Sequence, residues 1–195
     1  MMTRIDFRYM KKTHYAPMFA VVAAAALLSS CDDSKSEARK ALIRVGVIQS
    51  ENDVTGKAGQ QALFDACTKK EIGIAKALID AGVDVNASLV EGKSPLVQAA
   101  YQGNVELAKV LIAAGANVNH KSNYGTMSIL MHAICGGDHV EMVRVLVDAG
   151  ADPNFRTKTG NSNFTARPGV NVLQYAKDMN RPKVVRFLTQ RGVEA

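Results

Sequence analysis

Few side chains in this sequence have the types and spacing that acid–base or metal chemistry requires. Histidine occurs four times, and beyond the first 30 residues only His120, His132 and His139 remain. None of these has a cysteine or carboxylate at the spacing of a metal site, so we expect no bound zinc. Asp138 next to His139 can be imagined as a dyad, but a structural role in a turn is the better interpretation. With no phosphate-binding loop and no Gly-x-Ser-x-Gly motif, we predict a non-enzyme with no catalytic residue, metal, cofactor or small-molecule substrate.

Cys31 is the one residue for which the sequence predicts covalent modification. Four basic residues lie within the first 12 positions, and an apolar run follows at 16–28. This order is that of a secretory signal at 1–30, and the run is shorter than a membrane-spanning helix needs. The stretch Leu28-Ser29-Ser30-Cys31 resembles the bacterial lipobox, in which the cysteine becomes the first mature residue and carries lipid. The alternative is a cleaved periplasmic protein in which Cys31 has no such role.

The lipobox resemblance implies a lipid anchor on the periplasmic face of a bacterial membrane. Two or more acyl chains hold a protein stably to a bilayer. Asp32 resembles an inner-membrane retention signal, so the inner membrane is favoured over the outer. Residues 31–36 then form the lipidated cysteine and a polar tether. A start at Met10 instead of Met1 would leave the mature protein unchanged.

The charge balance argues against nucleic acid as a partner. Four of the 24 Lys and Arg residues and one of the 18 Asp and Glu residues lie in 1–30, so the formal charge of +6 falls to +3 once this segment is removed. A nucleic-acid-binding domain is usually more basic than that.

A nine-residue unit recurs along the chain and determines the fold that must position all of these residues. It reads LIDAGVDVN at 78–86, LIAAGANVN at 111–119 and LVDAGADPN at 146–154, and a degenerate fourth copy ends at 191–193. The first two copies are 33 residues apart, which is the period of a stacked helical array.

A second motif opens each helix pair in phase with the first. Its best copy is SPLVQAA at 94–100, with weaker copies at 61–66, 128–133 and 171–176. The two motifs together resemble the ankyrin repeat over residues 61–193, although no copy keeps the family's histidine after the leucine. The resemblance implies an all-α ankyrin-repeat solenoid of about four repeats, occupying 61–195.

The local chemistry of these motifs agrees with helix pairs. Ser94 is a good N-cap, and Pro95 stands at the first helical position, where its missing N–H costs nothing. Gly115 suits the left-handed conformation that ends a helix. Each pair is too small to bury its own apolar face, so neighbouring pairs must stack into one core.

Upstream of the repeats, the segment 37–47 aligns with the second-helix segment 106–116. We therefore predict an N-terminal capping helix at 35–46, within a cap and linker region that spans 37–60. The alternative is a plain amphipathic linker helix.

The spacing of the motif leucines reveals a long loop in the third connection. The leucines of the helix-opening motif are Leu63, Leu96, Leu130 and Leu173, and they are separated by 33, 34 and 43 residues. The loop at 155–170 contains no acidic residue, and its aromatic residues Phe155 and Phe164 are expected to be exposed. Long loops often carry function, although a tolerated surface insertion explains this loop equally well.

Repeat arrays bind partners through a concave face and through their loop tips. In the repeat register, Gln98, Tyr101, His132 and Tyr175 take outward positions on the first helices. Aromatic and arginine side chains are enriched among binding hot spots. The residues that we predict to contact a protein partner are Tyr101, Tyr124, His132, Phe155, Arg156, Lys158, Phe164 and Arg167.

Resemblance at the level of architecture implies a sharper function. Small lipoproteins with ankyrin repeats are similar to immunity proteins paired with type VI secretion phospholipase effectors. Such a protein would bind a toxic lipase and block its active site or its access to lipid. The long loop would act as a plug, with its basic side chains on an acidic rim and Phe155 or Phe164 in an apolar cleft. The alternative is a scaffold that stabilises a periplasmic enzyme without inhibiting it.

Overall fold

A computed structural model describes most of the chain beyond the predicted signal sequence. Every regular element within the described residues is a helix, and none of these helices is long and apolar enough to cross a membrane. Cys31 and Asp32 lie outside the described residues. The structure describes residues 34–44, 46–50, 53–88, 92–120, 127–157 and 168–194.

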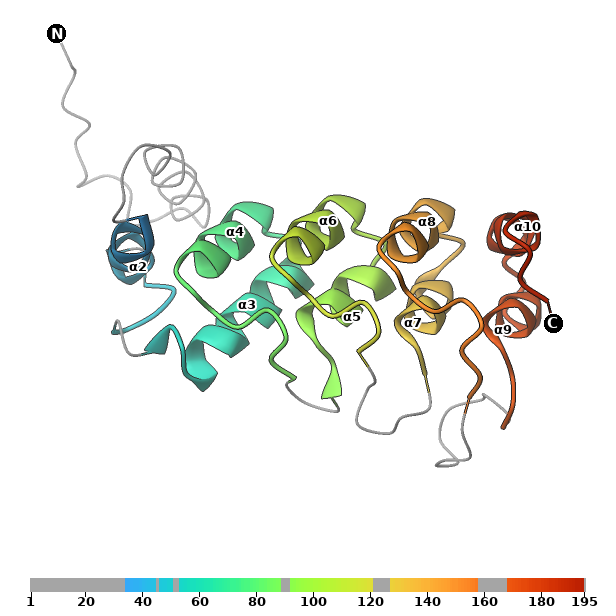
Figure 1. Ribbon diagram of the computed structural model, residues 1–195. Coiled ribbons are helices and arrows are strands. Elements are labelled where there is room, and N and C mark those ends of the chain that lie inside the picture. The colour runs from blue at the N-terminus through green and yellow to red at the C-terminus, as the bar shows by residue number, and fades with distance from the viewer. Residues whose placement is uncertain are drawn as a thin grey trace, which may run out of the picture.

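The helices form two parallel rows that run the length of the molecule (Figure 1). The inner row holds the first helix of each pair and the outer row holds the second, with one further helix at the N-terminal end of the outer row. The connections between pairs project beyond the inner row, at the bottom of Figure 1. This arrangement confirms the predicted all-α solenoid. The inner row is α3 Lys57–Lys69, α5 Pro95–Tyr101, α7 Ile129–Gly136 and α9 Val172–Asp178; the outer row is α2 Ser34–Arg44, α4 Ile72–Asp80, α6 Val105–Ala113, α8 Val140–Asp148 and α10 Pro182–Gln190.

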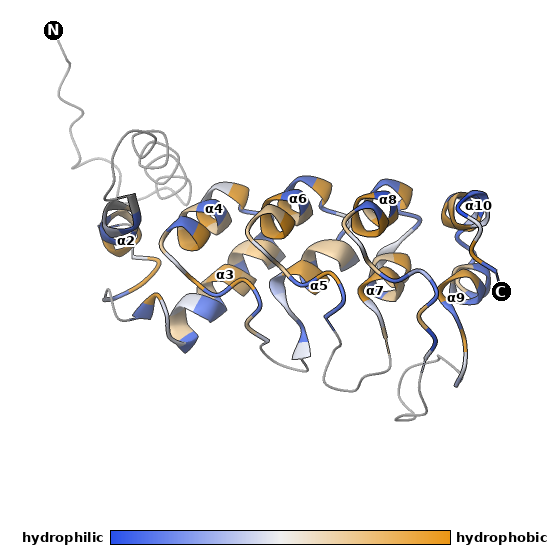
Figure 2. Ribbon diagram, in the orientation of Figure 1, coloured by the Kyte–Doolittle hydropathy of each residue, from blue (hydrophilic) through white to orange (hydrophobic). Residues whose placement is uncertain are grey.

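One continuous hydrophobic core fills the space between the rows. Figure 2 shows the hydrophobic sides of the inner and outer helices turned toward each other along the stack. The leucine of each helix-opening motif is at most 3% exposed. Burying such a side chain contributes about 1.5–3 kcal/mol. The core leucines from the two recurring motifs are Leu63, Leu96, Leu130, Leu173, Leu78, Leu111 and Leu146.

The helix boundaries follow from residues that the sequence motifs contain. The Ser94 hydroxyl accepts a hydrogen bond from the Val97 N–H at 3.3 Å, with Pro95 in the first turn. Such caps are worth about 1 kcal/mol. After the outer helices, Gly115 has a φ of 87°, in the left-handed region that favours glycine. Equivalent side-chain caps begin α6, α7 and α9 at Asn104, Ser128 and Asn171.

The N-terminal helix α2 covers the open end of the first outer helix. Its residues Ala38 and Leu42 are fully buried, and it packs against α4. Arg39 adds a hydrogen bond from Nε to the Ala81 carbonyl at 2.9 Å, which satisfies a group at the end of α4. The helix is the predicted cap. It runs from Ser34 to Arg44 rather than over 35–46.

The first inner helix begins upstream of the motif copy at 61–66. Helix α3 starts at Lys57, directly after Gly56. Gly59 lies so close to the preceding turn that an added Cβ would come within 2.1 Å of the Val54 carbonyl oxygen. The turn at 53–56 therefore packs onto the start of α3, at a distance that only a glycine at position 59 allows.

Candidate protein-binding surface

Asparagine side chains join the turns that follow consecutive outer helices. We number the repeats by their helix pairs: repeat 1 is α3–α4, repeat 2 is α5–α6, repeat 3 is α7–α8 and repeat 4 is α9–α10. The Asn86 amide donates to the Gly115 carbonyl at 3.0 Å and accepts from the Asn117 N–H at 2.7 Å. Asn119 repeats this bridge to Gly150 and Asp152 at 2.9 and 3.0 Å.

The junction between repeats 3 and 4 is held differently. Both carboxylate oxygens of Asp138 accept backbone N–H groups at the start of α10, from Lys183 at 3.3 Å and Val184 at 3.1 Å. In return, Arg181 Nε donates to the Ile134 carbonyl of α7 at 3.0 Å. A negative group at a helix N-terminus and a positive group at a C-terminus both complement the helix dipole. Asp138 therefore has the structural role that its place in a turn predicts.

The long loop leaves and re-enters the repeat stack through a short closed stem. Arg156 and Asn171 form an isolated antiparallel bridge. The Thr157 N–H donates to the Val170 carbonyl at 2.9 Å, and Gly169 N–H donates back to Thr157 at 2.8 Å. The two ends of the loop are thus held together beside the start of α9.

Tyr101 is the most prominent side chain on the inner row. It is 48% exposed and is the only large hydrophobic side chain exposed in the described part of the chain. It occupies the last position of α5, where the backbone lies against α7: a Cβ on Gly136 would come within 1.6 Å of the Tyr101 carbonyl oxygen. The structure therefore places Tyr101 on an accessible face near the middle of the stack, as predicted.

His132 lies on the neighbouring helix α7, but most of it is covered. Its Nε2 atom is buried and has no hydrogen-bond partner within the described residues. Burial, with smaller effects from Lys93 and His120, lowers the pKa of His132 to about 4. The imidazole is therefore neutral at physiological pH, and only a minor part of it is accessible to a partner.

Two predicted contact residues lie at the loop stem, at the opposite end of the first helices from Tyr101. Arg156 is exposed, and its Nη1 donates to the Gly169 carbonyl at 3.0 Å. Phe155 is half-buried and packs against the core. The expectation of an exposed Phe155 is wrong, because its side chain finds apolar core residues within reach. The remaining predicted contact residues, Tyr124, Lys158, Phe164 and Arg167, lie outside the described residues.

Tyr175 does not take the outward position that the repeat register assigned to it. It is only 4% exposed. Burial and the neighbouring Cys135 raise the pKa of Tyr175 above its usual value. A tyrosine ring is large enough to reach back into the junction with repeat 3, whereas Gln98 at the equivalent position of repeat 2 stays half-exposed.

The described residues offer little other chemistry. No group of three His, Cys, Asp or Glu residues within them is arranged to hold a metal ion. The His139 ring packs against a turn, since a Cβ on Gly103 would lie 2.7 Å from it. Burial raises the pKa of the Cys67 thiol to about 12, which keeps this cysteine protonated and unreactive.

The residues that join the repeats were not predicted from the sequence. Asn86 and Asn119 were visible as the invariant last residue of the nine-residue unit, but the unit alone does not show that the amide reaches the next repeat. Asp138 and Arg181 are 43 residues apart and carry no local signal. Their roles depend on which helices the fold brings together.

Comparisons with known proteins agree with this architecture. A family model described as ankyrin repeats in three copies matches residues 96–195, and one described as ankyrin repeats in many copies matches residues 63–112. A comparison with curated proteins finds no match. The two family matches together extend from the first inner helix to the end of the chain.

Proposed function

The chain belongs to the ankyrin-repeat family, and from this premise we propose that its inner-row face binds a protein partner. Ankyrin repeats are protein–protein interaction modules, and stacked repeats offer an extended surface that a single helix pair lacks. The observation that carries the proposal is Tyr101, a 48% exposed aromatic side chain near the middle of this face. Tyrosine, tryptophan and arginine side chains are enriched among binding hot spots, which cluster near the centre of an interface.

The finer proposal concerns location. A signal sequence at 1–30 and the lipobox cysteine Cys31 support a chain tethered to a bacterial membrane and facing the periplasm. Asp32 favours the inner membrane. A tethered binding module keeps its partner at the membrane surface without needing a catalytic site of its own.

We further propose that the partner is a secreted toxin, such as a type VI phospholipase effector, and that binding inhibits it. The support is the combination of a predicted lipid anchor with an ankyrin solenoid, together with the basic long loop. Because Phe155 packs against the core, Phe164 is the aromatic side chain left to enter a cleft of the toxin. Arg156, Lys158 and Arg167 would contact the rim around it.

A pull-down tests the binding proposal. The mature chain with a C-terminal tag in place of the lipid is mixed with a lysate of the source bacterium, and the bound proteins are identified. We expect one stoichiometric partner whose affinity falls at least about tenfold, roughly 1.4 kcal/mol, in Tyr101→Ala. Thr68→Ala is the matched control, because Thr68 has the same place in repeat 1 and its hydroxyl bonds only to the Phe64 carbonyl of its own helix. The substitution keeps the Thr68 carbonyl, which accepts a hydrogen bond from the Gln102 amide at 2.8 Å.

The activity of the captured partner decides between the finer readings. Inhibition of a lipase or another toxin by the wild-type chain, lost on deletion of 158–167, supports the immunity proposal and the plug. A partner that keeps full activity when bound favours the non-inhibitory scaffold. Undiminished inhibition after the deletion would exclude the loop as the plug.

A further inference from the structure

A basic side chain occupies the same register position on every outer-row helix. Each lies six residues before the glycine that follows its helix. All five are exposed. We call this set the basic ladder; its members are Lys40, Lys76, Lys109, Arg144 and Arg186. Because stacked helices are about 8–10 Å apart, the ladder forms a regular row of positive charge along the outer face.

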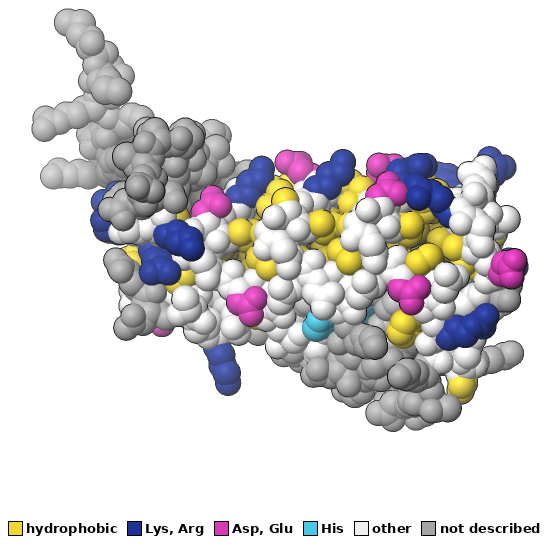
Figure 3. Space-filling model, viewed as in Figure 1, with side chains coloured by type: hydrophobic (Ala, Val, Ile, Leu, Met, Phe, Trp, Pro, Cys, Tyr) yellow, Lys and Arg dark blue, Asp and Glu magenta, His cyan; other side chains and the backbone are white. Residues whose placement is uncertain are grey.

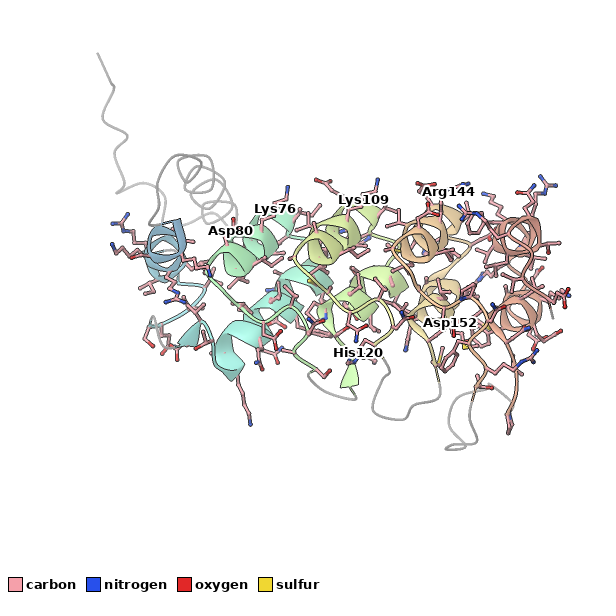
Figure 4. The ribbon with its side chains drawn as sticks, viewed as in Figure 1. Lys76, Asp80, Lys109, His120, Arg144 and Asp152 are labelled. Atoms are coloured by element: carbon pink, nitrogen blue, oxygen red, sulfur yellow. The ribbon has the colours of Figure 1, made fainter. Side chains whose placement is uncertain are left out.

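Figure 4 shows the direction of the central members. Lys76, Lys109 and Arg144 point away from the stack on the same side, from α4, α6 and α8. In Figure 3 basic side chains recur along this edge of the molecule, with acidic ones between them. The ladder is thus a feature of one face and is not spread around the solenoid.

The side chains in the middle of the ladder are available for contacts with another molecule or surface. Within the described residues, neither Lys76 nor Lys109 takes part in an ion pair. Arg144 differs, because it pairs with Glu141 at 3.2 Å and lies over the Phe187 ring. Lys76 and Lys109 therefore form no ion pair with the described residues that would hold the repeats together.

The outer row is also more basic than the inner row. Among the described side chains, its helices expose eight Lys and Arg residues against four carboxylates. The inner-row helices expose three against two. The carboxylates of the outer row are Asp80, Glu106, Glu141 and Asp148, and two of them are engaged by Arg144 and Arg191.

The start of the outer row lies close to the predicted lipid anchor. Only two residues separate Cys31 from Ser34, so α2 begins within about 10 Å of the lipidated residue. Lys35, Lys40 and Arg44 are exposed on this helix. At physiological ionic strength, charges act over about 8 Å, so these side chains would sense the charge of the bilayer.

We propose that the outer-row face lies on the anionic phospholipid headgroups of the membrane that holds Cys31. The lipid anchor, which this inference takes from the proposed function, brings α2 to the surface, and the basic ladder extends the contact along the solenoid. The inner row and Tyr101 then face away from the bilayer, toward an arriving partner. Charge complementarity and the short tether select the bilayer as the occupant of this face.

Vesicle binding tests the proposal without any partner. The mature chain with Cys31→Ser, which cannot be lipidated, is mixed with phosphatidylglycerol vesicles or with phosphatidylcholine vesicles, and the bound fraction is measured by sedimentation. We expect binding to phosphatidylglycerol alone, weakened by added salt. A basic residue near an anionic surface is worth about fivefold in partition, so Lys76→Gln with Lys109→Gln should reduce it about 25-fold.

The matched control removes the same charge from the other face. Lys69→Gln with Lys177→Gln changes two exposed inner-row lysines, and we expect less than about a twofold effect on partition. No binding to phosphatidylglycerol, or an equal loss in both double variants, would overturn the proposal. Partner capture by the Lys76→Gln, Lys109→Gln chain should be unchanged, so a failure of partner binding in the wild type counts against the proposed function and not against membrane docking.

Discussion

The junctions between the first three repeats and the last junction meet the same need with different chemistry. In the regular junctions, Asn86 and Asn119 each bridge to the turn of the next repeat through two hydrogen bonds. In the last junction, Asn154 has the same place in the unit, but within the described residues its side chain makes no such bridge. Asp138 and Arg181 hold that junction instead.

The long loop lies in this last junction. It adds about nine residues between repeats 3 and 4 and ends at Asn171, which caps α9 and bonds to the Glu194 carbonyl. A polar turn ladder depends on strict spacing, whereas charged caps join helix ends that the core already brings together. An insertion is therefore tolerated where the junction relies on helix ends and on packing.

We expect the largest effect from a substitution that disrupts the packing of the last junction. Phe187 is 5% exposed, and the guanidinium groups of Arg144 and Arg191 lie 4.9 and 5.1 Å from its ring centre. We expect Phe187→Ala to cost about 3–5 kcal/mol, which would unfold repeat 4 first. Urea unfolding followed by circular dichroism measures this. Val185→Ala, on the same helix but half-buried, should cost clearly less, and equal costs would contradict a special role for Phe187.

Acid should weaken the regular junctions, which contain the buried histidine. The folded pKa of His132 is about 4, below the ordinary value of 6.5, so the unfolded chain binds the proton more readily. Stability from the neutral imidazole is present above pH 6.5 and is lost as the pH falls toward 4, by up to about 3 kcal/mol. Unfolding free energies at several pH values in this window measure it. His132→Phe should flatten this dependence, and an unchanged slope would contradict it.

Removing the charged cap should have a smaller effect on the last junction. Asp138→Ala leaves the N–H groups of Lys183 and Val184 without their acceptor, at a cost of about 1–2 kcal/mol. Asp138→Asn keeps one acceptor oxygen and should lose less. Hydrogen exchange of the α10 amides reports the change locally. Unaltered protection in Asp138→Ala would show that packing alone holds α10.

We expect the smallest effects from two asparagine substitutions, which compare the two kinds of junction directly. Asn119→Ala removes two exposed hydrogen bonds to repeat 3 and should cost about 1 kcal/mol. Asn154→Ala changes the same unit position without a bridge and should cost no more than about 0.3 kcal/mol. Both are measured by urea unfolding. Similar costs would mean that the asparagine acts within its own turn and not between repeats.

The repeat register predicted the exposure of Tyr101 correctly and the exposure of two other aromatic side chains wrongly. Tyr101 is exposed at the predicted place because α5 ends there and its backbone contacts Gly136. Tyr175 and Phe155 were expected to face outward, yet both turn toward the core. A large side chain at the edge of a stack can reach apolar surface on the neighbouring repeat. The free energy gained by burying it there is not visible in the repeat register.

The sequence by itself determined the class of fold, the number of helix pairs and the place of the long loop. These depend on local spacing: the period of about 33 residues, the capping residues and the glycines that end the outer helices. Only the tertiary structure decided which side chains join the repeats, because Asp138, Arg181 and Phe187 meet their partners over sequence distances that carry no local pattern. It also decided that the basic ladder lies along one face, since the stacking of the helices places equivalent positions of separate repeats side by side.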